Sequence, residues 1–351
     1  MRLAMISTPF VAVPPHDYGG TELVVYELVE GLVARGHDVT LFATGDSSTA
    51  AELRWLIPKA QWPPNMLVEL NHTSWALRRV AEGGYDLVHL HCAAGLAFGR
   101  LLPTLPMVYT MHHERSKDLA AFYPHFPDIH YVAISEDQAR REVSLPHVTV
   151  IHHGLDPERY EWTARPQGYV AFIGRFARVK GPHTAIDAAA RADVPITVAG
   201  ETHSVDGDFG KREVEPRLQQ AHVTYLGKVG MEQKVPLLRD ARALLTPNAW
   251  NEPFGLVLAE AMLSGCPVVG FPRGSIPELI EEGVTGFIVH TPDELTELIR
   301  HGGPLDAFDR ERCRLRAIER FGREHMVERH EDLYQRVARE AGRGPSLAGA
   351  A

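Results

Sequence analysis

Short apolar runs alternate with amphipathic segments through the first half of the chain. Residues 3–7 and 38–43 are apolar runs of strand length, and residues 21–34 between them place leucines and valines at helical spacing. A β-α-β opening of about forty residues predicts a parallel sheet with a right-handed crossover. The same patterns predict further strands at 85–91, 106–111, 129–134 and 148–151, and helices at 66–81 and 136–143.

A second series of strands and helices follows a polar, proline-containing segment at 154–167, which is typical of a linker. Strands are expected at 169–173, 196–199, 223–226, 243–245, 268–269 and 286–289, and a long terminal helix at 319–339. The fold class is therefore α/β, with two doubly wound, Rossmann-like halves. Ligands of such sheets bind at the carboxyl ends of the strands, so we expect the cleft between the halves to hold the site.

Composition narrows the class of protein. The chain has 351 residues, of which 44% are hydrophobic, enough for two domains with a core each. A net charge of −9 argues against nucleic acid as a partner. Three cysteines make no disulfide framework and indicate the reducing cytoplasm. No apolar stretch approaches the ~18 residues of a membrane span, and the first apolar run is too short for a signal peptide.

The stretch from Trp250 to Cys266 reads W-N-E-P-F-G-L-V-L-A-E-A-M-L-S-G-C. Residues 256–263 have helix-forming composition, and Pro253 suits a first helical turn. Glu252 should then lie in the loop ahead of the helix and Glu260 inside it, separated by roughly 10 Å. The helix N-terminus between them is a seat for phosphate, and carboxylates on either side can accept hydrogen bonds from sugar and ribose hydroxyls.

Two glutamates on a polar surface are the simpler interpretation, since surface glutamate is common. Glu260, however, stands in an apolar run, where a buried acid needs a partner. The stretch resembles the E-x7-E signature of the retaining glycosyltransferases of family 4, which have the GT-B fold. The resemblance covers nearly the whole chain. It implies an acceptor-side domain over residues 1–155, a donor-binding domain over 165–320, and a terminal helix at about 321–340 that packs back on the first domain.

Two loops extend the resemblance. In G-R-F-A-R-V-K-G, after the strand at 169–173, Arg175 and Lys180 occupy positions whose family counterparts clamp the donor diphosphate. Backbone N–H groups of Gly255 and Leu256 would help them. The loop ending in Gly19, Gly20 and Thr21 departs from the G-x-G-x-x-G dinucleotide fingerprint, which disfavours a Rossmann oxidoreductase. In the family such a loop lies beside the donor phosphates; Gly20 is assigned to the diphosphate, and Gly19 and Thr21 to the acceptor side.

A histidine is the other catalytic candidate besides Glu252. His112 follows the strand at 106–111, at the expected cleft, and the resemblance places a histidine here against the transferred sugar. His113 is the counterpart if the strand ends one residue later, and a purely structural histidine stays open. The family's usual P-N-G-[IV]-D turn is H-H-G-L-D in this chain, with His153 in place of asparagine.

Two possible metal sites are the alternatives to this interpretation. Asp206-Gly207-Asp208 is a D-x-D triplet, the kind that holds manganese in the other large glycosyltransferase fold, but it lies in a polar loop. The histidine pairs at 89/91, 112/113 and 152/153 suggest zinc, yet they fall at three different strand ends. We therefore expect no metal and no cofactor, with a nucleoside-diphosphate sugar as co-substrate.

These residues together predict a retaining, metal-independent enzyme of the hexosyltransferase type. Its donor would be a nucleoside-diphosphate sugar, with UDP favoured and GDP possible. The acceptor would be a hydroxyl of a saccharide, a lipid or a secondary metabolite. A nucleotide-sugar epimerase of the same fold and a non-catalytic nucleotide-sugar-binding protein remain as alternatives. The sequence leaves donor, acceptor, pathway and oligomeric state open.

Overall fold

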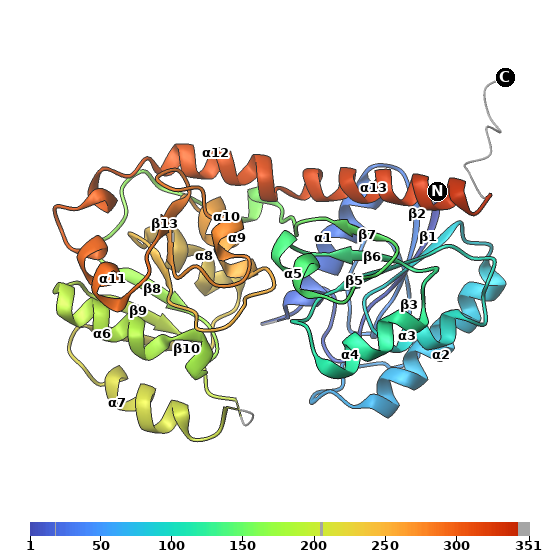
Figure 1. Cartoon of the computed structure of the whole chain (residues 1–351), viewed down its shortest axis with the longest axis horizontal. Helices are drawn as coiled ribbons and strands as arrows, with labels where there is room; N and C mark the ends of the chain where they lie inside the picture. Colours follow the sequence, from blue (N-terminus) through green and yellow to red (C-terminus); the bar gives the residue numbers. More distant parts are fainter. Residues whose placement is uncertain (18, 204–205, 343–351) are drawn as a thin grey trace. The chain divides into compact units, whose positions relative to one another are not determined.

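The computed structural model describes residues 1–17, 19–203 and 206–342 (Figure 1). The chain divides into two compact units. The first unit runs from Met1 to Gly154 and resumes at Arg323, and the second runs from Leu155 to Gly322. Each unit is built on its own parallel β-sheet, so the expected α/β class with two Rossmann-like units is confirmed.

The first unit has a seven-stranded sheet of order β3-β2-β1-β4-β5-β6-β7, with every pairing parallel. Its strands are β1 Arg2–Ile6, β2 Asp38–Phe42, β3 Glu52–Arg54, β4 Leu87–Leu90, β5 Met107–Met111, β6 His130–Ala133 and β7 Val148–Val150. The sequence did not predict β3, because this three-residue edge strand lacks a buried apolar run. The other six lie where the apolar pattern placed them.

Helices cover both faces of this sheet. They are α1 Gly20–Ala34, α2 Met66–Gly83, α3 Ala94–Gly99, α4 Lys117–Phe122, α5 Glu136–Arg141 and α13 Arg323–Glu340. Helix α1 contacts α13, and α2 contacts α3 on the other side of the sheet (Figure 1). Asn65 caps α2 by accepting hydrogen bonds from the backbone N–H groups of Leu67 and Val68.

The second unit has a six-stranded parallel sheet of order β10-β9-β8-β11-β12-β13. Its strands are β8 Val170–Ile173, β9 Ile196–Ala199, β10 Val223–Gly227, β11 Leu244–Thr246, β12 Val268–Gly270 and β13 Gly286–Ile288. Its α-helices are α6 Pro182–Ala192, α7 Glu215–Leu218, α8 Met231–Asp240, α9 Leu256–Leu263, α10 Ile276–Leu279, α11 Pro292–Ile299 and α12 Arg310–Phe321. Helix α6 packs with α11, and α9 packs with α8 and α12.

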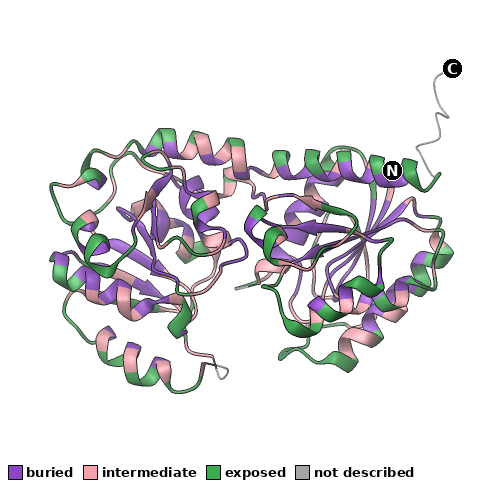
Figure 2. Cartoon of the chain, in the orientation of Figure 1, coloured by how far each residue is buried: buried purple, intermediate pink, exposed green. Residues whose placement is uncertain are grey.

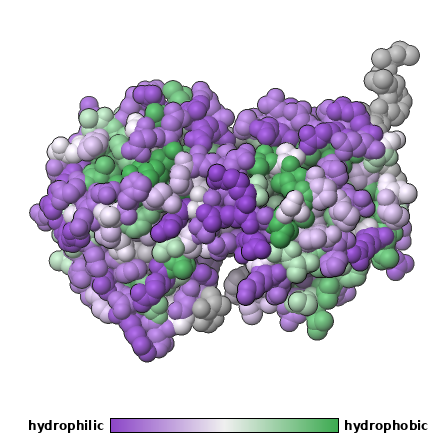
Figure 3. Space-filling view, in the orientation of Figure 1, coloured by the Kyte–Doolittle hydropathy of each residue, from purple (hydrophilic) through white to green (hydrophobic). Residues whose placement is uncertain are grey.

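Burial follows this layering in both units. Figure 2 shows the central strands of both sheets largely buried, whereas β3, β7 and β10 at the sheet edges have no buried residue, and most helices are buried on one side and exposed on the other. Hydrophilic residues cover most of the face drawn in Figure 3, and apolar residues form separate patches on it. No described helix is both long and apolar enough to cross a membrane.

The chain crosses between the units at two points, and both differ from the sequence expectation. The single helix expected at 319–339 is two helices, because Gly322 leaves helical geometry with ψ of 146°. A Cβ there would lie 2.5 Å from the carbonyl oxygen of Ile318. Leu155 pairs with Gly322, and Tyr160 is buried. Part of the segment expected to be a linker at 154–167 is thus packed into the second unit.

Candidate active site

Two loops at the carboxyl edge of the second sheet are in direct contact. One is the 3₁₀ turn Arg178–Lys180 after β8, and the other follows β11. The backbone N–H of Ala249 donates to the carbonyl oxygen of Val179 at 2.7 Å. Gly181 has φ of +72°, and a Cβ on it would lie 2.3 Å from the carbonyl oxygen of Pro247. Glycine is therefore required there, and the contact brings Lys180 beside the loop that carries Glu252.

Glu252 is anchored through one carboxylate oxygen. Its Oε2 accepts hydrogen bonds from the Lys180 ammonium, from Asn248 Nδ2 at 2.9 Å and from Trp250 Nε1 at 3.2 Å. The Lys180 Nζ also lies 4.5 Å from the centre of the Trp250 ring. Glu252 is only 7% exposed, and no described residue donates to its Oε1. A carboxylate held in this way keeps one oxygen as an oriented acceptor for a ligand.

The backbone of Glu252 is held by residues 274 and 275. The N–H of Ser275 donates to the Glu252 carbonyl oxygen at 2.9 Å, and the Ser275 hydroxyl donates to the carbonyl oxygen of Phe254 at 3.0 Å. Gly274 has φ of +61°, and a Cβ there would lie 2.3 Å from the Glu252 nitrogen. The glutamate is thus fixed by both backbone and side-chain contacts, which gives the rigidity that a binding site needs.

Helix α9 begins at Leu256, with Gly255 at its N-cap in the left-handed region at φ of +80°. Pro253 was expected in the first helical turn, but it lies in the preceding loop, because the chain turns at Gly255 before the helix starts. The first residues of α9 are half-buried rather than buried. Their backbone N–H groups lack helical partners, so they are available to an anion.

Glu260 lies one turn inside α9 and is 2% exposed. Its Oε1 accepts a hydrogen bond from the Lys234 ammonium of α8 and another from the Tyr160 hydroxyl at 3.3 Å. The described part of the chain provides no donor to its Oε2. The two signature glutamates therefore share one arrangement. In each, one carboxylate oxygen accepts hydrogen bonds from a lysine and from neutral donors, and the second oxygen can accept a hydrogen bond from a ligand.

Arg175 is placed at the same sheet edge, directly after β8. Its Nε lies 3.2 Å from Oδ2 of Asp206, and Asp208 pairs instead with Arg212 at 2.8 Å. The two acids of the D-x-D triplet thus contact different arginines. Among the residues that the structure describes, no group of three or more His, Cys, Asp or Glu side chains is arranged to hold a metal ion.

The glycine loop of the first unit lies at the start of α1, where Gly19 is the N-cap and Gly20 the first helical residue. The preceding Tyr18 is outside the described residues. Thr21 is half-buried, and the next residue, Glu22, is buried and accepts a hydrogen bond from the Thr8 hydroxyl at 2.5 Å. Burial raises the pKa of Glu22. Nothing in the sequence marks this acid, which is one of several glutamates in the helix.

His112 is half-buried directly after β5, whereas His113 is exposed. The Gln138 side-chain amide donates to the carbonyl oxygens of Met111 and His113, at 2.9 and 2.8 Å, and so holds the backbone on both sides of His112. The His112 ring is hydrogen-bonded to His91 and stacked on His153. The structure therefore places His112, rather than His113, in an ordered polar cluster.

The predicted site residues fall into two groups. The second unit brings together Arg175, Lys180, Glu252, Gly255, Leu256 and Glu260 at one sheet edge, and the first unit carries Gly19, Gly20, Thr21 and His112. Sequence reasoning missed the donors that hold the glutamates, namely Asn248, Trp250, Tyr160 and Lys234. Asn248 and Trp250 could have been found because they directly precede Glu252. Tyr160 and Lys234 carry no local signal, since only the fold brings them to α9.

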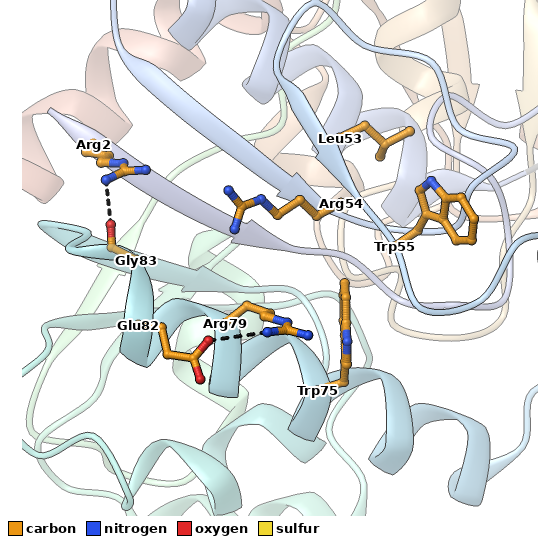
Figure 4. Close-up of a pocket in the computed structure, with 8 residues that line it drawn as sticks. All are labelled: Arg2, Leu53, Arg54, Trp55, Trp75, Arg79, Glu82 and Gly83. Atoms are coloured by element: carbon orange, nitrogen blue, oxygen red, sulfur yellow. Dashed lines mark hydrogen bonds and ion pairs between the residues drawn. The ribbon is translucent and has the colours of Figure 1, made fainter.

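A surface hollow of about 570 Å³ in the first unit is a separate feature (Figure 4). It is lined by Arg2, Leu53, Arg54, Trp55, Trp75, Arg79, Glu82 and Gly83. Each arginine already has an acidic partner, Arg2 with Asp38, Arg54 with Glu52 and Arg79 with Glu82. None of the predicted site residues lines the hollow, so it is not part of the candidate site.

The two parallel-sheet units define a class, an α/β protein of the GT-B fold. Residues 18–159 match the family described as Glycosyltransferase Family 4, and residues 161–301 match Glycosyl transferases group 1. The chain belongs to glycosyltransferase family 4, as the sequence resemblance indicated, and is a glycosyltransferase.

Similar proteins agree with this assignment. A phosphatidyl-myo-inositol mannosyltransferase from Mycobacterium tuberculosis is 27% identical, over 82% of each chain. The structure of sucrose-phosphate synthase from Thermosynechococcus elongatus has a TM-score of 0.80 at 21% identity, covering 97% of this chain and 100% of that one. Anabaena HepE, in complex with UDP and glucose, has a TM-score of 0.74 at 20% identity, covering 95% and 99%. At these identities the two structures support the fold alone.

Proposed function

We propose that the enzyme transfers a hexosyl group from a nucleoside-diphosphate sugar to a hydroxyl acceptor, with retention of configuration and without a metal. A UDP-sugar is the favoured donor and a GDP-sugar the other candidate; the acceptor is a saccharide, a lipid or a secondary metabolite. One observation carries the proposal. Glu252 and Glu260 lie on either side of the N-terminus of α9, and in each of them one carboxylate oxygen accepts hydrogen bonds while the other has no donor among the described residues.

Each part of the donor has a matching group in the second unit. The diphosphate would lie at the N–H groups of Gly255 and Leu256, where the helix dipole and free donors favour an anion. Arg175 and Lys180 would contribute two cations beside it. The free oxygen of Glu260 would accept a hydrogen bond from a ribose hydroxyl, since a buried acceptor favours a polar ligand group.

The free oxygen of Glu252 would accept hydrogen bonds from hydroxyls of the transferred sugar. The family resemblance adds three roles in the first unit. Gly20 would contribute to diphosphate binding, His112 would contact the sugar near its reacting carbon, and Gly19 and Thr21 would lie on the acceptor side.

The chemistry needs stabilisation of a leaving diphosphate. The bond between the anomeric carbon and the phosphate oxygen breaks, and its electron pair stays on that oxygen, where negative charge grows. Lys180, Arg175 and the start of α9 are fixed positive groups that stabilise this charge more in the transition state than in the ground state. The acceptor oxygen bonds to the anomeric carbon from the same face, and its proton passes to the leaving phosphate oxygen.

The place of action is proposed to be the cytoplasm. All three cysteines, Cys92, Cys266 and Cys313, are buried as free thiols, which suits a reducing compartment. Nucleoside-diphosphate sugars and the acceptor are the partners proposed, with no nucleic acid.

The test is a screen of nucleotide sugars by thermal shift, followed by mass spectrometry of the hits with and without candidate acceptors. We expect one donor class to stabilise the protein and a glycosylated product to form only when acceptor is present. The Glu252→Gln variant is the matched control, because it keeps the side-chain size but removes the carboxylate. A donor sugar altered without any acceptor would show an epimerase instead, and binding without any turnover would show a non-catalytic binding protein.

A further inference from the structure

Five histidine rings meet inside the first unit. His89 and His91 come from β4 and its end, His112 follows β5, His153 follows β7, and His330 belongs to α13. The ring centroids are 4.2 Å apart for His89 and His91, 5.2 Å for His91 and His112, and 5.5 Å for His112 and His153. The sequence places His89, His91, His112 and His153 at separate strand ends, and the parallel sheet brings them to one edge, where the His330 ring of α13 lies 5.5 Å from that of His89.

Within this cluster, one hydrogen bond reaches the ring proposed to contact the sugar. His91 Nδ1 and His112 Nε2 are 2.9 Å apart. Burial lowers the pKa of His91 and of His112 well below the usual range, so both rings are neutral at pH 7 and each carries one proton. The bond therefore has two possible directions, and each direction fixes the tautomers of both rings.

The environment of His91 decides between the two directions of this hydrogen bond. His91 is 3% exposed, and its Nε2 is buried with no hydrogen-bond partner among the described residues. If His112 donated to His91, the His91 proton would sit on this Nε2 as a buried N–H without an acceptor. Orphaned buried N–H groups are rarer in proteins than unfilled acceptors. The favoured arrangement has the His91 proton on Nδ1, donated to His112 Nε2.

We propose that His91 is a positioning residue that holds His112 as the Nδ1-protonated tautomer. His112 then offers an N–H donor at Nδ1, to which no described residue is hydrogen-bonded. Its ring is held by His91 on one side and by stacking on His153 at an interplanar angle of 23°. Such a neutral, oriented donor suits a sugar hydroxyl or a developing oxyanion, a role that rests on the proposed function.

Nitrogen-15 NMR of histidine-labelled protein tests the tautomer without any substrate. We expect His112 to carry its proton on Nδ1 in the wild type and to shift toward the Nε2-protonated form in His91→Phe, which has no donor. His91→Asn should keep the Nδ1 form, because its amide N–H can take the place of the imidazole Nδ1–H. A wild-type His112 protonated on Nε2 would overturn the proposal, and this measurement decides the case even if His91→Phe fails to fold.

Kinetics supply the second readout. His91→Phe should lower kcat about tenfold, the effect of one lost hydrogen bond, with the donor KM changed less than twofold. His91→Asn should recover most of the loss. His330→Phe is the matched control, since it removes a buried ring of the same cluster that makes no hydrogen bond to His112. Equal losses in His91→Phe, His91→Asn and His330→Phe would overturn positioning by His91. A wild type inactive with every donor would refute the proposed function but leave the tautomer result intact.

Discussion

Acidification from pH 7 to pH 5 should destabilise the first unit far more than the second. In the first unit, burial lowers the pKa of five buried histidines, His72, His89, His91, His153 and His330, and of the half-buried His112. In the second unit, burial lowers the pKa of His183, and that ring is half-buried. The second unit is therefore an internal control within the same molecule.

The sign follows from where the protons bind. When folding lowers the pKa of a histidine, the unfolded chain binds the proton at a higher pH than the folded chain does. The contribution of this histidine to the unfolding free energy is therefore complete above pH 6.5 and is lost as pH falls. Burial lowers the pKa of His72 and His330 to about 4, and that of His153 to about 3. At pH 5 each of the three should cost about 2 kcal/mol, or about 6 kcal/mol together.

Two carboxyl groups of the same unit oppose this effect. Burial raises the pKa of Glu22 and of Glu69, so the folded state binds their protons more readily and gains stability as pH falls through the folded pKa. These two acids offset part of the loss from the histidines, and we expect the net unfolding free energy of the first unit to fall between pH 7 and pH 5.

Urea unfolding with pulsed hydrogen exchange and mass spectrometry measures this, because its peptides report the two units separately. His72→Leu removes one titrating ring and should make the pH dependence shallower by up to about 1.4 kcal/mol per pH unit. Equal pH dependence in both units, or none in the first between pH 7 and pH 5, would refute the assignment of buried neutral histidines.

Two further predictions concern the second unit. Transfer should continue in excess chelator, because in the proposed site basic side chains and the start of α9 supply the positive charge that stabilises the leaving diphosphate. Activity that vanishes with chelator and returns with manganese would instead indicate that Asp206 and Asp208 bind a metal. Gly274→Ala should cost more than about 2 kcal/mol of stability and abolish transfer, since a Cβ would meet Glu252 backbone atoms at 2.3 and 2.4 Å. Gly283→Ala is the control in the same urea titration: Gly283 has φ of +72°, but a Cβ there would meet no atom within 4 Å. It therefore measures the cost of the backbone conformation without a steric clash.

Much of this fold could be predicted from the sequence because parallel strands are buried on both faces. Apolar runs such as those of β1 and β5 are therefore visible without alignment. Edge strand β3 was missed for the same reason, since it is too short and exposed to leave such a run. The break at Gly322 was missed because the helical pattern of charges continues on both sides of it.

The site was only partly predictable. Glu252 and Glu260 could be found because their spacing around a helix start is a local feature of the chain. The partners of Glu260 could not, because Tyr160 and Lys234 lie 100 and 26 residues away and meet it only through packing. The pairing of His91 with His112 likewise depends on strand order, which places β4 beside β5.

The central claim is that the second unit binds a nucleoside diphosphate through Lys180, beside Glu252 and the start of α9. Calorimetric titration of UDP and GDP into the wild type, Lys180→Ala and Arg178→Ala tests it most directly. Arg178 is the matched control, because it lies in the same 3₁₀ turn and carries the same charge, yet its guanidinium lies 4.7 Å from the centre of the Phe209 ring.

We expect saturable binding of at least one diphosphate to the wild type. Lys180→Ala should weaken that binding about 10- to 150-fold, which corresponds to the ~1.5–3 kcal/mol of a charge-assisted contact. Arg178→Ala should change it less than about threefold. Equal affinity in the wild type and Lys180→Ala would contradict the account.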